Sequence, residues 1–190
     1  MKLKLTLAAF AVIAAACGSA VAEIAPTTTA APSMESMTPG DDMGDMGAMN
    51  MGDPNAVPAA AVGGDLVTGT FRVLGSAPAG LDRVQGLAQL ARHDGGTTVT
   101  INFENLVPAR DYVAHVHAGS CFDDGGSHYQ FEAGGSVMPP NEIHLAFTSQ
   151  ADGTGFMTAE NHMVASRDAT AVVVHQRTEN APKIACADLR

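Results

Sequence analysis

The chain has 190 residues, with 20 acidic against 10 basic side chains and a formal net charge of −10. No stretch of the sequence concentrates lysine and arginine, so we expect no nucleic-acid partner. The acidic balance bears on solubility and weak association and carries no information about the fold.

Residues 1–22 have the character of an export signal. Lys2 and Lys4 precede an uncharged apolar run from Leu5 to Ala16, and small residues follow it. The run is too short and wrongly flanked for a membrane-spanning helix. We therefore exclude this segment from the fold and expect an exported protein, located in the periplasm or at the outer face of the cell envelope.

Two cleavage sites remain open within the export signal. The sequence AVA at residues 20–22 fits ordinary signal peptidase cleavage, whereas the three alanines before Cys17 resemble a bacterial lipoprotein box. The cysteine count favours the lipoprotein, because Cys121 and Cys186 can pair and would leave Cys17 as a free thiol in an oxidising compartment. A lipid on Cys17 would tether the protein to a membrane.

Residues 23–62 are predicted to form a disordered linker. They include six acidic and no basic residues and almost no large apolar side chains except methionine, so they cannot bury enough surface to fold. Six methionines crowd into eighteen residues. They are either compositional drift in a low-complexity tail or a weak, exchangeable Cu(I) site, since thioethers favour Cu(I) over hard cations. The six are Met34, Met37, Met43, Met46, Met49 and Met51.

From about residue 63 the sequence takes on β character. Short runs of β-branched or alternating apolar residues are separated by turns rich in Gly, Pro, Asn and Asp. About eight strands at this spacing predict one all-β domain over residues 63–190, an antiparallel sandwich or Greek-key barrel. The recognisable strands lie at Leu66–Leu74, Val84–Ala91, Thr97–Phe103, Asp111–His117, Glu142–Thr148, Gly155–Thr158 and Ala169–His175.

Four of the seven histidines form a pattern that a metal site could use. His115 and His117 are two residues apart, which on a strand places both rings on one face. His128 follows in the glycine-rich loop FDDGGSHYQ, and His175 ends the apolar run ATAVVVH. A single histidine at a strand end is more often solvated, and spacing alone leaves the metal site and ordinary surface histidines equally open.

Residues 66–189 resemble the copper/zinc superoxide dismutase family. HVHAGSC resembles its HxH strand and cysteine loop, GGSHYQ its glycine–histidine–aromatic turn, and EIHLAFTSQADGTG the segment around its zinc-binding aspartate. ATAVVVH followed by KIAC resembles the last ligand strand and the closing cysteine strand. The resemblance implies an eight-stranded antiparallel Greek-key β-barrel and a Cys121–Cys186 disulfide. It also implies copper bound by His115, His117, His128 and His175.

The chain departs from the family pattern at the zinc site and in one loop. No histidine lies between His128 and His144, Ser136 stands where one is expected, and His144 takes the place of the zinc-binding aspartate. We therefore expect copper without zinc. Only QRTENAPKIA separates His175 from the last cysteine, so the long charged loop of the family is missing, and Lys183 replaces its arginine.

The resemblance implies superoxide dismutation, with His128 as a mobile ligand that carries a proton and Lys183 as the nearby cation. Without zinc, the second nitrogen of His128 needs another partner. Glu142 is the first candidate and Glu132 the next, although an exposed strand carboxylate is the plainer interpretation of Glu142.

Two functions remain open on the sequence alone. The first is a copper-only superoxide dismutase, which takes superoxide as its small-molecule substrate. The second is a non-catalytic periplasmic copper-binding or buffering protein, favoured by the methionines, the missing zinc site and the shortened loop. Either protein would draw on a copper donor. His162 and Met163 could add a soft metal pair, but solvated surface residues are the plainer interpretation, as for His93.

Overall fold

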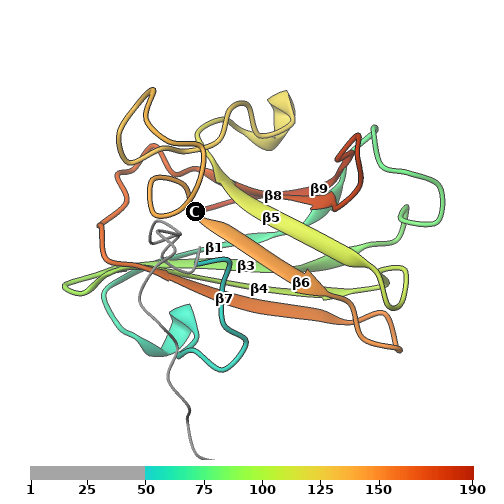
Figure 1. Ribbon diagram of the computed structural model, residues 1–190, viewed down its shortest axis with the longest axis horizontal. Coiled ribbons are helices and arrows are strands. Elements are labelled where there is room, and N and C mark those ends of the chain that lie inside the picture. Colours follow the sequence, from blue (N-terminus) through green and yellow to red (C-terminus); the bar gives the residue numbers. More distant parts are fainter. Residues whose placement is uncertain (1–49) are drawn as a thin grey trace, which may run out of the picture. The chain divides into compact units, whose positions relative to one another are not determined.

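The computed structural model describes residues 50–190 (Figure 1). The predicted export signal, Cys17 and the first five methionines of the methionine-rich stretch lie outside this range, so those expectations stay predictions. Within residues 50–190, no helix has the length and apolar character needed to cross a membrane.

Two antiparallel sheets make up the domain, which confirms the predicted all-β class (Figure 1). Two short 3-10 helices, η1 (Ala59–Ala61) and η2 (Cys121–Asp123), accompany them. The first sheet has the strand order β1 (Asp65–Thr70), β3 (Gln85–His93), β4 (Gly96–Glu104), β7 (Gly155–Asn161). The second has the order β2 (Arg72–Val73), β9 (Lys183–Asp188), β8 (Ala171–Gln176), β5 (Asp111–His117), β6 (His144–Thr148).

The sheets of residues 50–190 do not close into a complete barrel. At one seam, Thr68 and Arg190 exchange two backbone hydrogen bonds of 3.0 Å, just beyond the end of β9. At the other seam β6 and β7 do not pair, and the chain near residue 52 bridges them instead. There the amide of Ala146 donates to the carbonyl of Met51 at 2.8 Å, and the amide of Asp53 donates to the carbonyl of Thr158 at 2.7 Å.

The N-terminal boundary of the folded unit lies earlier than the predicted residue 63. Residues 50–62 were expected to be linker, yet Ala59 is buried and its amide donates to Thr100 Oγ1 at 2.9 Å. A small residue packed under a hydrogen-bonded turn carries almost no signal in composition, which explains why the linker prediction ran too far.

The predicted strand Leu66–Leu74 is two strands in the structure. β1 belongs to the first sheet and β2 to the second, and Phe71 lies at the break between them. The Phe71 side chain is buried against Phe103, with 4.4 Å between ring centroids, and its amide donates to the carbonyl of Gly86. The chain therefore crosses from the first sheet to the second within residues 66–74.

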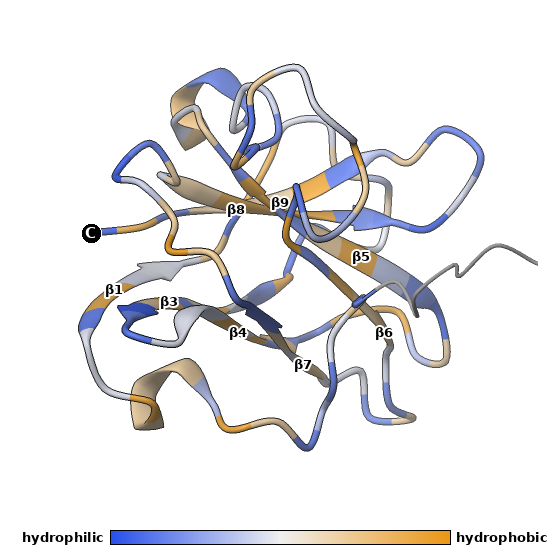
Figure 2. Ribbon diagram, turned by 60° about the vertical axis from the view of Figure 1, so that its left-hand side comes forward, coloured by the Kyte–Doolittle hydropathy of each residue, from blue (hydrophilic) through white to orange (hydrophobic). Residues whose placement is uncertain are grey.

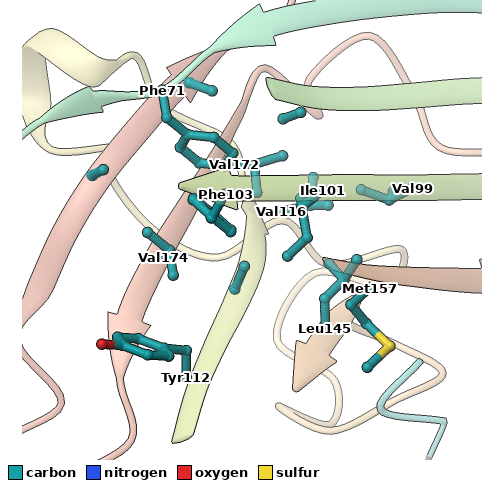
Figure 3. Close-up of a cluster of buried hydrophobic side chains, with 14 of the residues drawn as sticks. Phe71, Val99, Ile101, Phe103, Tyr112, Val116, Leu145, Met157, Val172 and Val174 are labelled. Atoms are coloured by element: carbon teal, nitrogen blue, oxygen red, sulfur yellow. The ribbon is translucent and has the colours of Figure 1, made fainter. Parts of the chain in front are cut away.

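The hydrophobic core fills the space between the two sheets. Figure 2 shows hydrophobic residues along the strands of both sheets. The buried ones form a single large cluster, because alternate side chains of a strand point to the same face. Complete burial of one Val, Leu, Ile, Phe or Met side chain contributes about 1.5–3 kcal/mol to the free energy of unfolding. Figure 3 shows this core, with Val99, Ile101, Phe103, Tyr112, Val116, Leu145, Met157, Val172 and Val174 among its members.

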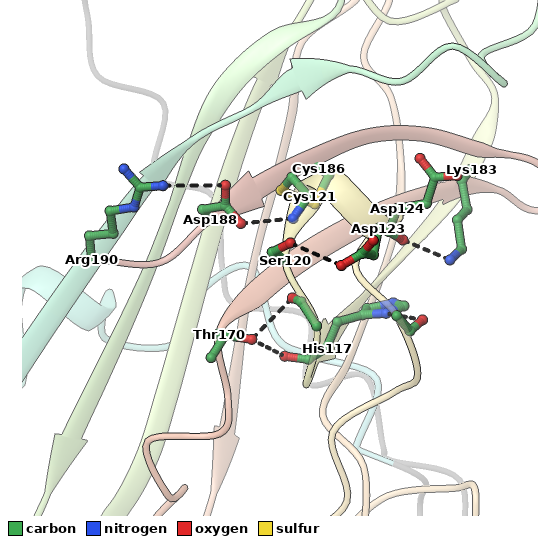
Figure 4. Close-up of a disulfide and its surroundings, with 12 residues drawn as sticks. His117, Ser120, Cys121, Asp123, Asp124, Thr170, Lys183, Cys186, Asp188 and Arg190 are labelled. Atoms are coloured by element: carbon green, nitrogen blue, oxygen red, sulfur yellow. Dashed lines mark hydrogen bonds and ion pairs between the residues drawn. A yellow bond between two sulfur atoms is a disulfide. The ribbon is translucent and has the colours of Figure 1, made fainter.

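The predicted disulfide is confirmed and ties a loop to β9 (Figure 4). Cys121 begins η2, and Cys186 is a fully buried residue of β9, with 5.5 Å between the two Cα atoms. The Cys121 amide also donates to Asp188 Oδ1 at 2.8 Å. A link across 65 residues constrains a large loop of the unfolded chain, which is worth about 4 kcal/mol in the chain-entropy account.

Candidate metal centre

Four histidines converge at one end of the second sheet. His115 and His117 lie two residues apart on β5, and His175 on β8 stands directly opposite Val113 of β5. Residues two apart on a strand and residues paired across strands share a face, so these three rings meet. His128 joins them through an isolated β-bridge to His117. One ligand atom from each of the four lies within 4.8 Å of the others.

Backbone carbonyls orient two of the rings. His117 Nδ1 lies 3.2 Å from the carbonyl oxygen of Gly126, and His175 Nδ1 lies 3.0 Å from that of Ala181. A carbonyl oxygen only accepts, so each Nδ1 carries the hydrogen and donates it. The Nε2 atom of each ring therefore keeps its lone pair, which is the form that binds a metal.

Three nitrogens in the cluster are buried without a hydrogen-bond partner within residues 50–190: His115 Nδ1, His117 Nε2 and His175 Nε2. Leaving one buried polar atom unpaired costs about 1–3 kcal/mol, so three at one point require an explanation. A shared metal ion would satisfy all three. Four imidazole nitrogens suit a transition metal such as copper or zinc and do not suit Mg²⁺ or Ca²⁺.

The cluster favours neutral imidazoles. Burial, helped by the charges of the neighbouring histidines, lowers the pKa of His115 to about 2. Burial and His128 together lower the pKa of His117 to about 4. Burial also lowers the pKa of His175, against the hydrogen bond that its ring makes with Ala181. Since a metal binds the neutral ring, the folded protein holds these ligands ready for a metal at neutral pH.

Glu142 anchors His128 from outside the cluster. Its Oε2 atom lies 2.6 Å from His128 Nδ1 and 3.1 Å from His144 Nε2, and its Oε1 atom accepts a hydrogen bond of 2.9 Å from Gln130. Burial alone would raise the pKa of this carboxyl, but the hydrogen bonds from Gln130, His144 and His128 hold it below its usual value. An ionised carboxylate therefore fixes the ring of His128.

The plainer interpretation of Glu142 as an exposed strand carboxylate is wrong. Its side chain is only 3% exposed and lies just before β6. The second candidate, Glu132, is exposed and is engaged through its backbone, whose amide donates to Asn141 Oδ1 and whose carbonyl accepts from Asn141 Nδ2. The burial of Glu142 could not be predicted from sequence, because its side chain contacts Gln130 and His128, which a separate loop brings to it.

His128, Glu142 and His144 form a second group of potential ligands whose atoms lie within 4.8 Å of one another. This group offers three donors, one fewer than a structural zinc site takes. Ser136 is exposed and accepts the amide of Met138 at 3.1 Å, so it does not contribute to the group. The expectation of copper without zinc remains a prediction.

Lys183 lies beside the cluster on β9. It stands opposite His175 in the strand register, and its Nζ atom donates to the carbonyl of Asp124 at 2.7 Å (Figure 4). Its positive charge contributes to lowering the pKa of both His117 and His175. The sequence-predicted cation is therefore held within electrostatic reach of the four-histidine cluster.

His115 and His128 are half-buried, whereas the other two histidines of the cluster are buried. The side chain of His128 is 34% exposed, whereas His117 is almost fully buried. The connection from β8 to β9 covers only residues 177–182. This loop offers little chain that could narrow the approach of a small molecule to the cluster. The half-buried His115 and His128 are therefore the members of the cluster that solvent reaches.

No family model matches the chain, and no curated protein matches it. Among solved structures, it is similar to a Cu/Zn superoxide dismutase from Brucella abortus, with a TM-score of 0.50 and 19% identity. The match covers 66% of this chain and 100% of that structure. This chain has the fold of that superoxide dismutase. Because the identity is low, the likeness establishes the fold alone.

Proposed function

We propose that the protein is a copper-dependent superoxide dismutase that works without zinc at the bacterial cell envelope. The observation that carries this proposal is the cluster of four histidine nitrogens, three of them buried without a partner, at one end of a superoxide dismutase fold. Copper bound there would supply one-electron chemistry, oxidising one superoxide to dioxygen and reducing a second, which takes up two protons and leaves as hydrogen peroxide.

His128 is the residue we assign to proton handling. Its Nδ1–H donates to Glu142, and the carboxylate stays in place because Gln130 and His144 also hold it. Because Nδ1 is engaged by Glu142, Nε2 is the ring nitrogen that His128 keeps free for the cluster. The ring can therefore carry a proton at Nε2 towards a small ligand while Nδ1 keeps its anchor, as a positioned general acid requires.

Lys183 is the residue we assign to substrate attraction. Superoxide is a small anion, and a cationic ammonium beside the cluster raises its local concentration there. The hydrogen bond from Lys183 Nζ to the carbonyl of Asp124 keeps this charge near the cluster. The ammonium of Lys183 is a point charge and lacks the two-pronged hydrogen-bonding geometry of arginine. Lys183 therefore attracts superoxide towards the cluster more than it positions the anion.

The deciding experiment is superoxide decay after pulse radiolysis on the copper-loaded full chain, with excess EDTA to silence free copper. We expect the decay rate to rise in proportion to protein-bound copper. His117→Ala removes one ligand and should lower copper affinity by at least about tenfold, with the activity lost in parallel.

Decay no faster than in the His117→Ala control, from protein that holds its copper firmly, would contradict dismutation. That outcome would support the copper-binding or buffering function on the same scaffold. A chain that binds no copper at the cluster would contradict both functions.

A further inference from the structure

Gln130 connects the carboxylate of Glu142 to a loop that lies outside the four-histidine cluster. Its Nε2 atom donates to Glu142 Oε1 at 2.9 Å, and its Oε1 atom accepts the backbone amide of Gly134 at 2.9 Å. A backbone amide only donates, so the bond from Gly134 fixes which end of the glutamine amide is the oxygen. Gln130 therefore presents an N–H group to Glu142.

The carboxylate of Glu142 receives three donors in this arrangement. Gln130 binds one oxygen, while His128 Nδ1 and His144 Nε2 lie 2.6 Å and 3.1 Å from the other. The Glu142 side chain is only 3% exposed, and a buried oxygen without a donor is costly. Glu142 also lines a hollow of about 270 Å³. Without Gln130, the carboxylate would turn towards water in this hollow and lose its contact with His128.

The loop of residues 131–141 holds the other partner of Gln130. Asn141 closes this loop, because its Oδ1 atom accepts the amide of Glu132 at 2.7 Å and its Nδ2 atom donates to the Glu132 carbonyl at 3.0 Å. Gly134 lies inside the segment that these two bonds close. Its amide therefore donates to Gln130 from a hydrogen-bonded part of the loop.

We propose that Gln130 is a positioning residue of the metal centre, which links the loop of residues 131–141 to Glu142 and thereby keeps the hydrogen of His128 on Nδ1. With Nδ1–H bound to the carboxylate, the lone pair of His128 lies on Nε2, the form that binds a metal. The proposal rests on the metal-binding role proposed for the four histidines. It does not depend on dismutation, because a copper-buffering protein would need the same orientation of His128.

The first measurement is the tautomer of His128 in the metal-free full chain, by two-bond 1H–15N correlation NMR above the usual histidine pKa. The His128 signals are identified by their loss in His128→Gln. We expect a single Nδ1–H form, which Gln130→Met should convert into a mixture of Nδ1–H and Nε2–H forms. Gln130→Asn should do the same and covers the case in which Gln130→Met unfolds, because its amide is one methylene too short to bridge Gly134 and Glu142.

The second measurement is the affinity of the chain for Cu(II), by competition with a chelator. Gln130→Met should lower this affinity by at least about tenfold, and the electron paramagnetic resonance spectrum of bound Cu(II) should change from one species to two. In a Glu142→Gln background, Gln130→Met should cause no further loss, because Gln130 acts through Glu142.

Gln85→Met is the matched control. Gln85 Nε2 donates to Glu104 Oε2 at 2.7 Å across β3 and β4 of the first sheet, so the variant removes a glutamine–glutamate bond of the same kind away from the cluster. It should leave the His128 tautomer and the copper affinity unchanged. A single Nδ1–H form in both Gln130 variants, or a further loss of affinity in the Glu142→Gln background, would overturn the proposal. The tautomer is measured without copper, so this failure is distinct from a failure to bind copper or to dismute superoxide.

Discussion

The carboxylate of Glu142 links two histidines that would otherwise act separately. One oxygen accepts from both His128 and His144, and the other accepts from Gln130. The ring of His128 is thereby fixed through a charge-assisted hydrogen bond, which is about twice as strong as a neutral one. An orienting partner of this kind commonly tunes a metal ligand as much as the ligand's own identity does.

We predict that Glu142→Gln leaves copper bound but weakens it by about 10–100-fold, because the anchor of His128 loses its negative charge. Superoxide decay per bound copper should fall as well. Both quantities are measurable on one preparation, by competition with a chelator and by pulse radiolysis.

Glu132→Gln is the matched control, since Glu132 is an exposed carboxylate in the same connection between His128 and β6. It should behave like the unaltered protein in both measurements. If Glu142→Gln also did so, Glu142 would be a structural group with no bearing on the metal.

The set of four histidines was implied by the family resemblance, and spacing alone fixes the geometry of only two of them. Because His115 and His117 are two residues apart on a strand, their side chains lie on the same face. The partner of His128 could only be guessed, because hydrogen bonds at Glu142 depend on side chains brought in by a separate loop. The hydrogen bond from Lys183 Nζ to the carbonyl of Asp124 could not be predicted for the same reason, because the loop after η2 brings Asp124 to Lys183.

At the scale of elements, the loop between η2 and His128 shapes the four-histidine cluster together with the strands. Gly125 has a φ of +81°, and a Cβ at this position would lie 2.4 Å from Val173 Cγ2 and 3.1 Å from His117 Nδ1. The next residue, Gly126, supplies the carbonyl that accepts from His117. The disulfide at Cys121 pins the start of the loop to β9.

We predict that Gly125→Ala lowers both stability and copper affinity. The positive φ alone costs about 1–2 kcal/mol in a residue with a side chain, and the added methyl group would push against Val173 and the ring of His117. Equilibrium urea unfolding and chelator competition measure the two effects.

Gly134→Ala separates backbone strain from crowding. Gly134 also has a positive φ, +76°, but a Cβ there would meet nothing within 4 Å. We expect a comparable strain cost and unchanged copper affinity. Equal copper affinities for the two variants would show that Gly125 does not position His117.

The strands show where sequence patterns succeed and fail. Asp111–His117 was predicted with the bounds of β5, because alternation and flanking turns both mark it. The run Leu66–Leu74 was predicted as one strand, since a crossing between sheets leaves the local β pattern intact. Phe71 looks like any other strand residue in sequence, and only its packing on Phe103 reveals the break.

At the scale of the whole molecule, the sandwich depends on residues 50–62, a segment whose composition predicts a linker. β6 and β7 do not pair within residues 50–190, and Met51 and Asp53 supply the missing backbone partners to Ala146 and Thr158. An unpaired strand edge leaves amide and carbonyl groups open to pairing with another chain. Residues 50–62 therefore close a seam that the two sheets leave open.

We predict that a chain starting at residue 63 is less stable than one starting at residue 50, by on the order of 3 kcal/mol. The shorter chain loses the seam hydrogen bonds of Met51 and Asp53 and the bond from Ala59 to Thr100, each worth about 1 kcal/mol. It also loses the buried side chain of Ala59. Equilibrium urea unfolding of both chains and of the full chain gives the comparison.

The chain starting at residue 50 should match the full chain in free energy of unfolding, because it keeps every contact of this seam. The exposed edges in the shorter chain should also make it aggregate more readily, which light scattering at matched concentration would detect. Equal stability of the two shortened chains would mean that the sheets hold together without the segment. The boundary predicted from sequence would then be the true one in energetic terms, with residues 50–62 lying on the domain without supporting it.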